Sequence, residues 1–272
     1  MIVDTFPFFN ELDLLEIRLQ HLWNIVDKFV LVEAAKTQSL IDKPFYFEEN
    51  RSRFSPYLDK IVHVKIPAED CPNNAGNLWR MENFQLNCVR RGTDSLDLKD
   101  DDIVIVNAVD EIPKTEALLE IIERIRTRRA SIVSTWMTYN TFFLNLITVN
   151  KGWTGTVATT HGIFTQLPSP YFLIHCREKV ESVTGGWHFG NQGGKKILYE
   201  KFHSCIEPFD KSVIPPYDVF CSEFDRKVKN GGSFLFSDKI DDSIQLQQVP
   251  LTDLPECVQR NLDKYRHLLY NV

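Results

Sequence analysis

The stretch DDIVIVNAVDEIP, residues 101–113, decides the fold of this chain. Its residues 103–106 are all β-branched and apolar, which is typical of a strand buried on both faces of a sheet. Asp110 and Glu111 follow where this strand should end, and Pro113 stops it because proline cannot donate to a strand ladder. Ligands of open α/β sheets bind at the carboxyl ends of the strands. We therefore expect a site for a hard cation such as Mg2+ or Mn2+ there; the alternative is that these acids only cap the next helix.

The residues before this stretch predict a parallel sheet. Apolar segments at 2–8, 28–34 and 60–66 have the composition of buried strands, and leucines at steps of three and four predict a helix after the first of them. Strand, helix and strand in this order imply right-handed crossovers between parallel strands. Between the second and third strands, residues 36–57 predict a long ordered loop with a short helix.

The second half is expected to contain more β-structure. We predict helices at 77–91 and 115–128, a strand at 130–139, shorter strands at 154–165 and 171–176, a turn at Gly231-Gly232 and a helical stretch at 256–270. At 272 residues the chain is long enough for one large domain, and we favour one domain with a C-terminal extension.

Composition describes an ordinary globular protein, with 43% hydrophobic and 25% charged residues. The net charge of -6 argues against a protein that coats nucleic acid, because phosphate binding calls for a basic surface. No apolar run approaches the roughly 20 residues needed to span a bilayer. Six scattered cysteines without a CxxC pair indicate free thiols in a reducing compartment, and their even number leaves disulfides open.

Six motifs carry a resemblance to a known family: FFNELDLLEIRL at 8–19, FVLVEAAKT at 29–37, PFYFEENRSRF at 44–54, VDEIP at 109–113, GWHFG at 186–190 and LPECVQRNLDKYRHLL at 254–269. With these motifs the chain resembles glycosyltransferase family 17, typified by the enzyme that adds the bisecting N-acetylglucosamine to N-glycans. The resemblance implies a GT-A-type, Rossmann-like α/β fold with a mostly parallel central sheet flanked by helices. Within a single domain, residues 1–113 would bind the nucleotide-sugar, 114–220 would form a β-rich acceptor half, and 221–272 a helical extension.

The resemblance also implies the reaction. A divalent cation, Mn2+ or Mg2+, would bridge the protein and the diphosphate of a nucleotide-sugar, with UDP-GlcNAc as the first donor to try and a glycan hydroxyl as the acceptor. Transfer would proceed with inversion. The expected protein is a soluble cytoplasmic enzyme of bacterial or viral type, or the catalytic domain of a longer Golgi-type chain. The alternatives are a non-catalytic domain that binds nucleotide-sugars or glycans, and a metal-dependent phosphohydrolase built on Asp110 and Glu111.

The chain departs from the family at two positions. Similar proteins read Asp-Val-Asp-Glu-Ile-Pro, and here Ala108 replaces the first aspartate. Two carboxylates spaced two apart point to the same face of an extended segment, so the loss leaves Asp110, with His203 as a second expected ligand. We expect weakened metal binding and slower transfer, in a natural or an engineered variant. Leu86 replaces the arginine of a Gln-Arg-Asn motif in the family.

The remaining site residues follow from the motifs. His188 is the expected base for the acceptor hydroxyl, with Glu207 and Glu181 as rivals, because an imidazole can exchange a proton near neutral pH. A structural role is the alternative for His188, a plain helix cap for Asn10, and a solvated side chain for Lys36. The residues expected to contact the donor are Phe9, Asn10, Glu11, Glu33, Lys36, Gln85, Asn87, Ala108, Trp187 and Lys201.

Overall fold

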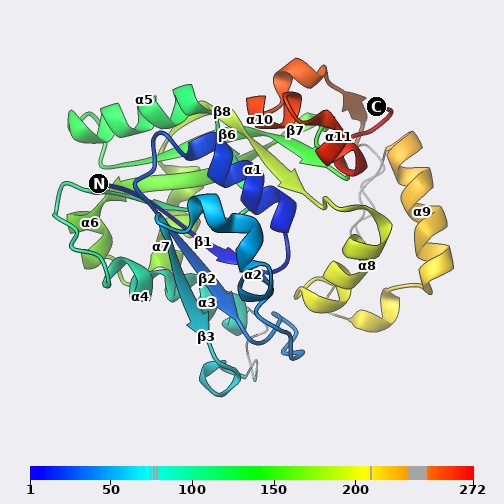
Figure 1. Cartoon of the computed structure of the whole chain (residues 1–272), viewed down its shortest axis with the longest axis horizontal. Helices are drawn as coiled ribbons and strands as arrows, with labels where there is room; N and C mark the ends of the chain where they lie inside the picture. The colour runs from blue at the N-terminus through cyan, green and yellow to red at the C-terminus, as the bar shows by residue number, and fades with distance from the viewer. Residues whose placement is uncertain (74, 76, 78, 209, 232–243) are drawn as a thin grey trace.

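One mixed sheet runs through the molecule, flanked by helices (Figure 1). The computed structural model describes residues 1–73, 75, 77, 79–208, 210–231 and 244–272. In this part of the chain the strand order is β3-β2-β1-β4-β7-β6-β8-β5, and β9 pairs with β7. The strands are β1 (Ile2–Phe8), β2 (Lys28–Ala34), β3 (Ile61–Ile66), β4 (Ile103–Val106), β5 (Glu111–Pro113), β6 (Ile132–Thr141), β7 (Leu146–Thr160), β8 (Glu181–Gly190) and β9 (Leu246–Gln248).

The expected α/β fold is confirmed, and its parallel part is the N-terminal one. β1 pairs in parallel with β2 and β4, and β2 with β3. Beyond β4 the sheet becomes mixed: β7 runs antiparallel to β4 and β6, whereas β6 and β8 are parallel. A parallel sheet aligns the carboxyl ends of its strands, so the ends of β1, β2 and β4 meet along one edge.

Helices cover both faces of the sheet. On one face Phe29 and Leu31 of β2 pack with α1 (Leu12–Leu22) and α5 (Thr115–Arg126). On the other, Val30 and Val32 pack with the second group of helices, because successive side chains of a strand point to opposite faces. This second group comprises α3 (Arg80–Asn87), α4 (Val89–Thr93), α6 (His161–Gln166) and α7 (Pro170–Cys176).

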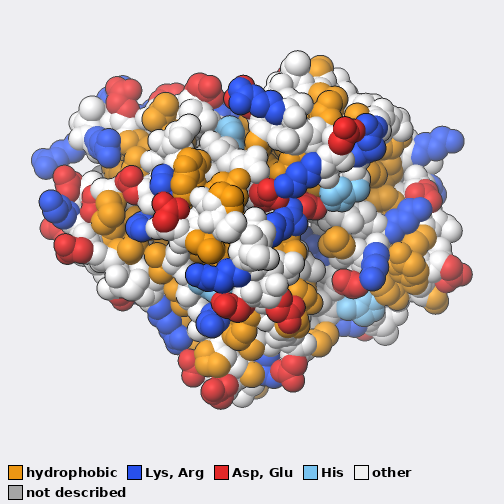
Figure 2. All heavy atoms as spheres, viewed as in Figure 1, with side chains coloured by type: hydrophobic (Ala, Val, Ile, Leu, Met, Phe, Trp, Pro, Cys, Tyr) orange, Lys and Arg blue, Asp and Glu red, His pale blue; other side chains and the backbone are white. Residues whose placement is uncertain are grey.

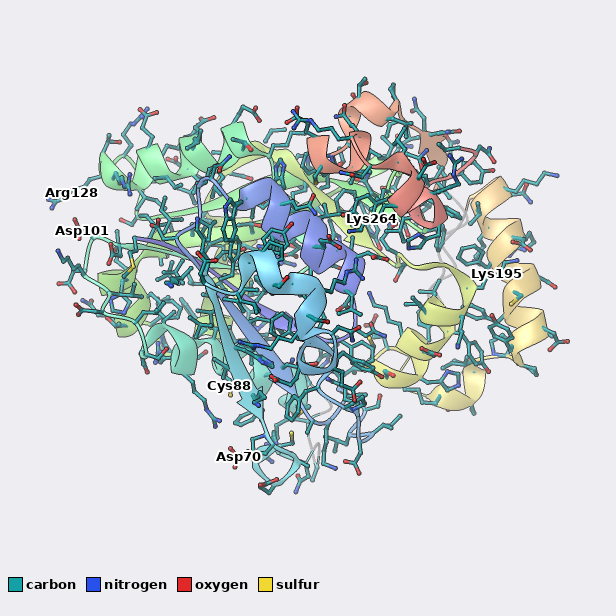
Figure 3. All side chains as sticks on the ribbon, viewed as in Figure 1. Asp70, Cys88, Asp101, Arg128, Lys195 and Lys264 are labelled. Atoms are coloured by element: carbon teal, nitrogen blue, oxygen red, sulfur yellow. The ribbon has the colours of Figure 1, made fainter. Side chains whose placement is uncertain are left out.

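Two further helices, α8 (Gly194–Ser204) and α9 (Tyr217–Asn230), stand at the right of Figure 1. They pack through Phe202, Phe220 and Phe224. Lys195, labelled in Figure 3, pairs with Asp225 of α9 at 2.7 Å. The remaining helices are short: α2 (Tyr46–Glu49), α10 (Glu256–Gln259) and α11 (Leu262–Tyr265). None of the helices in the described residues is long and apolar enough to cross a membrane.

Several element predictions were wrong. Residues 171–176 form α7 rather than a strand, because Pro170 occupies the first helical turn, where a missing N–H costs nothing. The strand predicted at 154–165 ends at Thr160, whose hydroxyl accepts from the Ile163 N–H and caps α6. The stretch 256–270 divides into α10, α11 and a 3-10 turn, and 77–91 divides into α3 and α4. Strands β5 and β8 and helices α8 and α9 were not predicted, and Gly232 of the predicted turn lies outside the described residues.

Candidate functional site

Two cavities meet at the edge where β1 and β4 end. The β2-side cavity, of about 190 Å³, lies between this edge, α3 and α8. The α8-side cavity, of about 150 Å³, lies between the start of α1 and α8. Both are lined by Glu11, Asp110 and Lys201. Together they reach the lower part of the ~300–1,000 Å³ range of small-molecule sites.

Asp110 is the acidic centre of this site. Burial alone would raise the pKa of its carboxyl, but the neighbouring His188 and the charge of Lys201 lower the pKa from 3.8 to about 2. The His188 Nε2 lies 3.6 Å from the Asp110 Oδ2. Burial would lower the pKa of Lys201, but the negative charge of Asp110 outweighs this effect and raises it. The structure therefore places a carboxylate and an ammonium group of opposite charge in the lining that the two cavities share.

His188 lies behind Asp110 rather than in either cavity. Its ring contacts those of Tyr139 (ring centroids 4.8 Å apart) and Trp153 (4.3 Å). Its Nδ1 is buried and has no hydrogen-bond partner in the described part of the chain. Because these two aromatic rings hold the imidazole in place, His188 can orient the carboxylate of Asp110.

Arg18 holds the turn that presents Asp110. It is fully buried on α1, and its guanidinium makes two bonds of 2.7 Å to the carboxylate of Asp4 on β1. Its Nη1 donates to the carbonyls of Ala108 (3.2 Å), Val109 (3.3 Å) and Glu111 (2.8 Å). The sequence analysis missed this network, although an arginine on an apolar helix stripe and an aspartate within an apolar strand were signals of a buried pair.

Ala108 and Asp110 lie on this turn and not on an extended segment as predicted. The Glu111 N–H donates to the Ala108 carbonyl at 3.1 Å, which closes the turn. Both residues nevertheless line the β2-side cavity. Glu111 instead points inward, where its carboxylate accepts from the Trp153 indole (2.6 Å), Arg177 (2.9 Å) and the Ala108 N–H (3.1 Å). The two adjacent acids therefore do not form the paired site that a phosphohydrolase would need.

Several predicted donor contacts lie around the cavities. Phe9, Lys36, Gln85 and Ala108 line the β2-side cavity, and Asn10 lines the other. Gln85 is anchored because its amide donates to the carbonyls of Phe8 (3.2 Å) and Val32 (3.0 Å). Lys36 is paired with Asp42.

Asn10 is not the helix cap considered as its alternative role. The side chain of Asn10 accepts no capping bond, and the cap position of α1 is Glu11. The Glu11 carboxylate accepts from the backbone N–H groups of Phe9 (3.2 Å) and Asn10 (3.1 Å).

Three other residues predicted to contact the donor line neither cavity and form hydrogen bonds within the protein. Glu33 is fully buried, and its carboxylate binds the Phe47 N–H (3.2 Å) and His63 (3.1 Å). Asn87 accepts from the Tyr171 N–H at 3.0 Å, which ties α3 to α7. Trp187 points away from His188, its neighbour in the strand, and its indole donates to the Asp253 carbonyl at 2.8 Å.

The predicted metal ligand and the rival bases are not gathered at Asp110. On α8, His203 lies two residues after Lys201, about 200° around the helix, and its Nδ1 contacts the Tyr199 carbonyl at 2.9 Å. Glu181 begins β8, roughly 23 Å along the strand from His188, and pairs with Arg124 at 3.2 Å. Glu207 is exposed after α8.

Glu82 is a cavity carboxylate that the sequence analysis missed. It lies on α3 and lines the β2-side cavity with Gln85, one helical turn later. Burial, with a smaller contribution from the charge of Glu207, raises the pKa of Glu82 from 4.5 to about 7. Its charge therefore changes near neutral pH, within reach of a ligand in this cavity.

The residues at the junction fit a cation held jointly with a ligand. Mg2+ often takes one or two protein carboxylates and completes its shell with phosphate oxygens and water. Asp110 and Glu11 supply two carboxylates to the same cavities. In the residues that the structure describes, no group of three or more His, Cys, Asp and Glu side chains could hold an ion by itself.

Comparisons with known proteins identify a family for this chain. Residues 1–167 match the model of glycosyltransferase family 17. Among solved structures, the chain is similar to one described as the crystal structure of 4-diphosphocytidyl-2C-methyl-D-erythritol synthase, with a TM-score of 0.36 and 12% identity over 68% of this chain and 89% of that one. A comparison with curated proteins gives no match.

Proposed function

Because the chain belongs to glycosyltransferase family 17, we propose that it moves a sugar from a nucleotide-sugar to a hydroxyl group of a glycan, with inversion. UDP-linked donors are the first to test, and N-acetylglucosamine is the first sugar. The observation that carries this proposal is that Asp110 and Lys201 both line the two cavities that meet at the strand ends, where their opposite charges stabilise each other. A nucleoside diphosphate leaving group concentrates negative charge, and a fixed ammonium group beside it favours its departure.

The two cavities suggest how the donor would lie. The β2-side cavity, with Phe9, Gln85 and Glu82, offers an aromatic ring and polar groups for a nucleoside. Lys201 at the junction suits the diphosphate, and the α8-side cavity then receives the sugar. This order places the bond that breaks beside Asp110.

Mn2+ or Mg2+ would be held by Asp110, with Glu11 as the second carboxylate. Such an ion supplies Lewis-acid stabilisation of the diphosphate charge when it is bound. The chain's own part is to keep Asp110 ionised and oriented, through His188 and the turn held by Arg18. Ala108 presents no carboxylate to this cavity, so we expect transfer slowed by ~10²-fold relative to a chain with aspartate there, by analogy with the loss of one preorganised electrostatic group.

His188 acts in this proposal as a positioning residue for Asp110. A base must lie within hydrogen-bond reach of the acceptor hydroxyl, and His188 lines neither cavity. Exchange of His188 for glutamine would keep a polar contact to Asp110 but remove the ring stack, so donor binding should weaken together with turnover. If His188 were the base, turnover would fall while donor binding stayed unchanged.

A non-catalytic domain that binds nucleotide-sugars or glycans is the second candidate, and Ala108 is the observation that favours it. Leu86 is consistent with it, because its side chain is buried in the core and cannot contact a ligand as the family's arginine would. The two candidates differ in one measurement. Release of UDP from UDP-sugars with Mn2+ and a glycan mixture, measured for wild type, Asp110→Asn and Ala108→Asp, should show slow turnover that the first variant abolishes and the second increases. Asp225→Asn, at an exposed carboxylate on α9, is the control. Nucleotide binding with no turnover in any variant would favour the binding domain.

A further inference from the structure

A groove separate from the Asp110 cavities crosses the mixed part of the sheet. It has a volume of about 500 Å³ and is lined by β6, β7 and β8, and none of its lining residues belongs to the two cavities described above. Its most prominent side chain is Trp136, which is 47% exposed although it lies on a central strand. An exposed indole at the centre of a sheet is unusual, because aromatic side chains usually bury their large apolar area.

Gly152 explains why Trp136 can lie flat. A Cβ atom at position 152 would lie 2.2 Å from the Trp136 Cζ2, 2.4 Å from its Cε2 and 2.9 Å from its Nε1. The indole therefore rests with one face on the backbone of β7, where glycine leaves room, and turns the other face outward. Glycine weakens a strand interior, and it often marks a close approach of this kind.

A raised segment of β7 forms a wall beside the indole. Ile147 pairs with Asn140 and Gly152 with Thr138, so residues 148–151 bulge out opposite a single residue of β6. The Thr148 hydroxyl closes the bulge by donating to the Lys151 carbonyl at 2.7 Å. The bulge places the exposed side chains of Asn150 and Lys151 beside the groove.

Lys151 connects the groove to the aromatic rings behind Asp110. The Lys151 ammonium lies 5.9 Å from the centre of the Tyr139 ring. Tyr139 stacks on His188, and His188 contacts Asp110. The groove and the rings behind Asp110 are therefore built on the same two strands, β6 and β8.

We infer that this groove binds an oligosaccharide segment of the glycan acceptor, away from the hydroxyl that reacts; this inference rests on the proposed function. A flat indole offers an apolar face to a pyranose ring, and hydroxyl, amide and ammonium groups beside it can bond the ring's hydroxyls. The polar groups of the lining are Thr138, Thr148, Thr184, Asn150, Lys151 and Lys114. A protein partner fits less well, because stable interfaces bury about 800 Å² per partner and this groove exposes one aromatic side chain.

The test is titration of the full chain with linear oligosaccharides of four to six units, built from N-acetylglucosamine, mannose or galactose, by calorimetry without donor. We expect at least one of the three to bind, and Trp136→Ala to weaken its binding by about tenfold. Gly152→Ala keeps the indole but displaces it, so it should weaken binding in the same direction. Phe172→Ala, at an exposed ring on α7 outside the groove, is the matched control and should bind as wild type does.

Three results would overturn the inference. They are equal binding by wild type and Trp136→Ala, no binding of any of the three oligosaccharides, and a wild-type dimer in sedimentation that Trp136→Ala dissociates. Titration of UDP with Mn2+ should give the same affinity in wild type and Trp136→Ala. A negative oligosaccharide result would therefore contradict only the inference about the groove. Failure of the wild type to bind any nucleotide would count against the proposed function itself.

Discussion

Replacement of Arg18 by methionine tests how the chain presents Asp110. Arg18 is completely buried, makes two bonds of 2.7 Å to Asp4, and supports the turn through three carbonyls. Methionine fills similar volume but donates nothing. It leaves the Asp4 carboxylate buried with the Asn107 amide at 2.9 Å as its remaining side-chain donor among the described residues.

The expected cost is large because one partner of a buried ion pair is removed. Such changes typically lower the free energy of unfolding by about 3–5 kcal/mol. The matched control is Arg91→Met, since Arg91 pairs with Asp70 at 3.4 Å and both side chains are about half exposed. Surface pairs of this kind contribute about 0–1 kcal/mol.

The test is urea unfolding of the two variants, with nucleotide binding measured for each. Arg18→Met should lose both stability and affinity for UDP, and the double variant Asp4→Asn/Arg18→Met should regain part of the stability because no charge is left stranded. A cost for Arg18→Met no greater than for Arg91→Met would refute the reasoning.

Further predictions concern the cavity residues. Ala108→Asp should raise turnover by ~10²-fold and lower the Mn2+ concentration needed for half-maximal UDP release; an unchanged Mn2+ titration would remove position 108 from the metal site. Since the pKa of Glu82 is raised to about 7 in the folded chain, wild type should lose stability as the pH rises from about 4.5 to 7, and Glu82→Gln should flatten this loss in pH-dependent unfolding. Since the pKa of Asp110 is lowered to about 2, the stability it contributes is present above pH 3.8, and the gap between wild type and Asp110→Asn should close as the pH falls toward 2; a constant gap would show that the charge of Asp110 is not the cause. His203→Ala should leave the Mn2+ titration unchanged, because its ring contacts a carbonyl within α8.

The sequence was sufficient for the elements whose pattern is local. β1, β2 and β4 were predicted because each is a continuous apolar run, and the acid after β4, proposed from the sequence as part of the site, lines both cavities. The run at 171–176 was ambiguous, since a short apolar segment suits a strand or a buried helix equally, and Pro170 was the overlooked helix signal.

Contacts between distant segments explain what the sequence could not provide. Arg18 and Asp4 are fourteen residues apart, and the turn they support is ninety residues further on, so only the folded sheet brings them together. The opposite directions of Trp187 and His188 follow from strand alternation, but β8 itself was not predicted because its glycines suggested a loop. Glu82 offered no signal, because its pKa depends on burial beside Glu207.

The most direct test of the central claim is calorimetric titration of UDP, in the presence of Mn2+, into wild type, Asp110→Asn, Lys201→Met and the control Asp225→Asn. If the donor diphosphate is held at the junction of the two cavities, wild type and the control should bind UDP with equal affinity. The two junction variants, Asp110→Asn and Lys201→Met, should bind it at least about tenfold more weakly. Equal affinity in all four proteins would contradict the claim that Asp110 and Lys201 form the donor site.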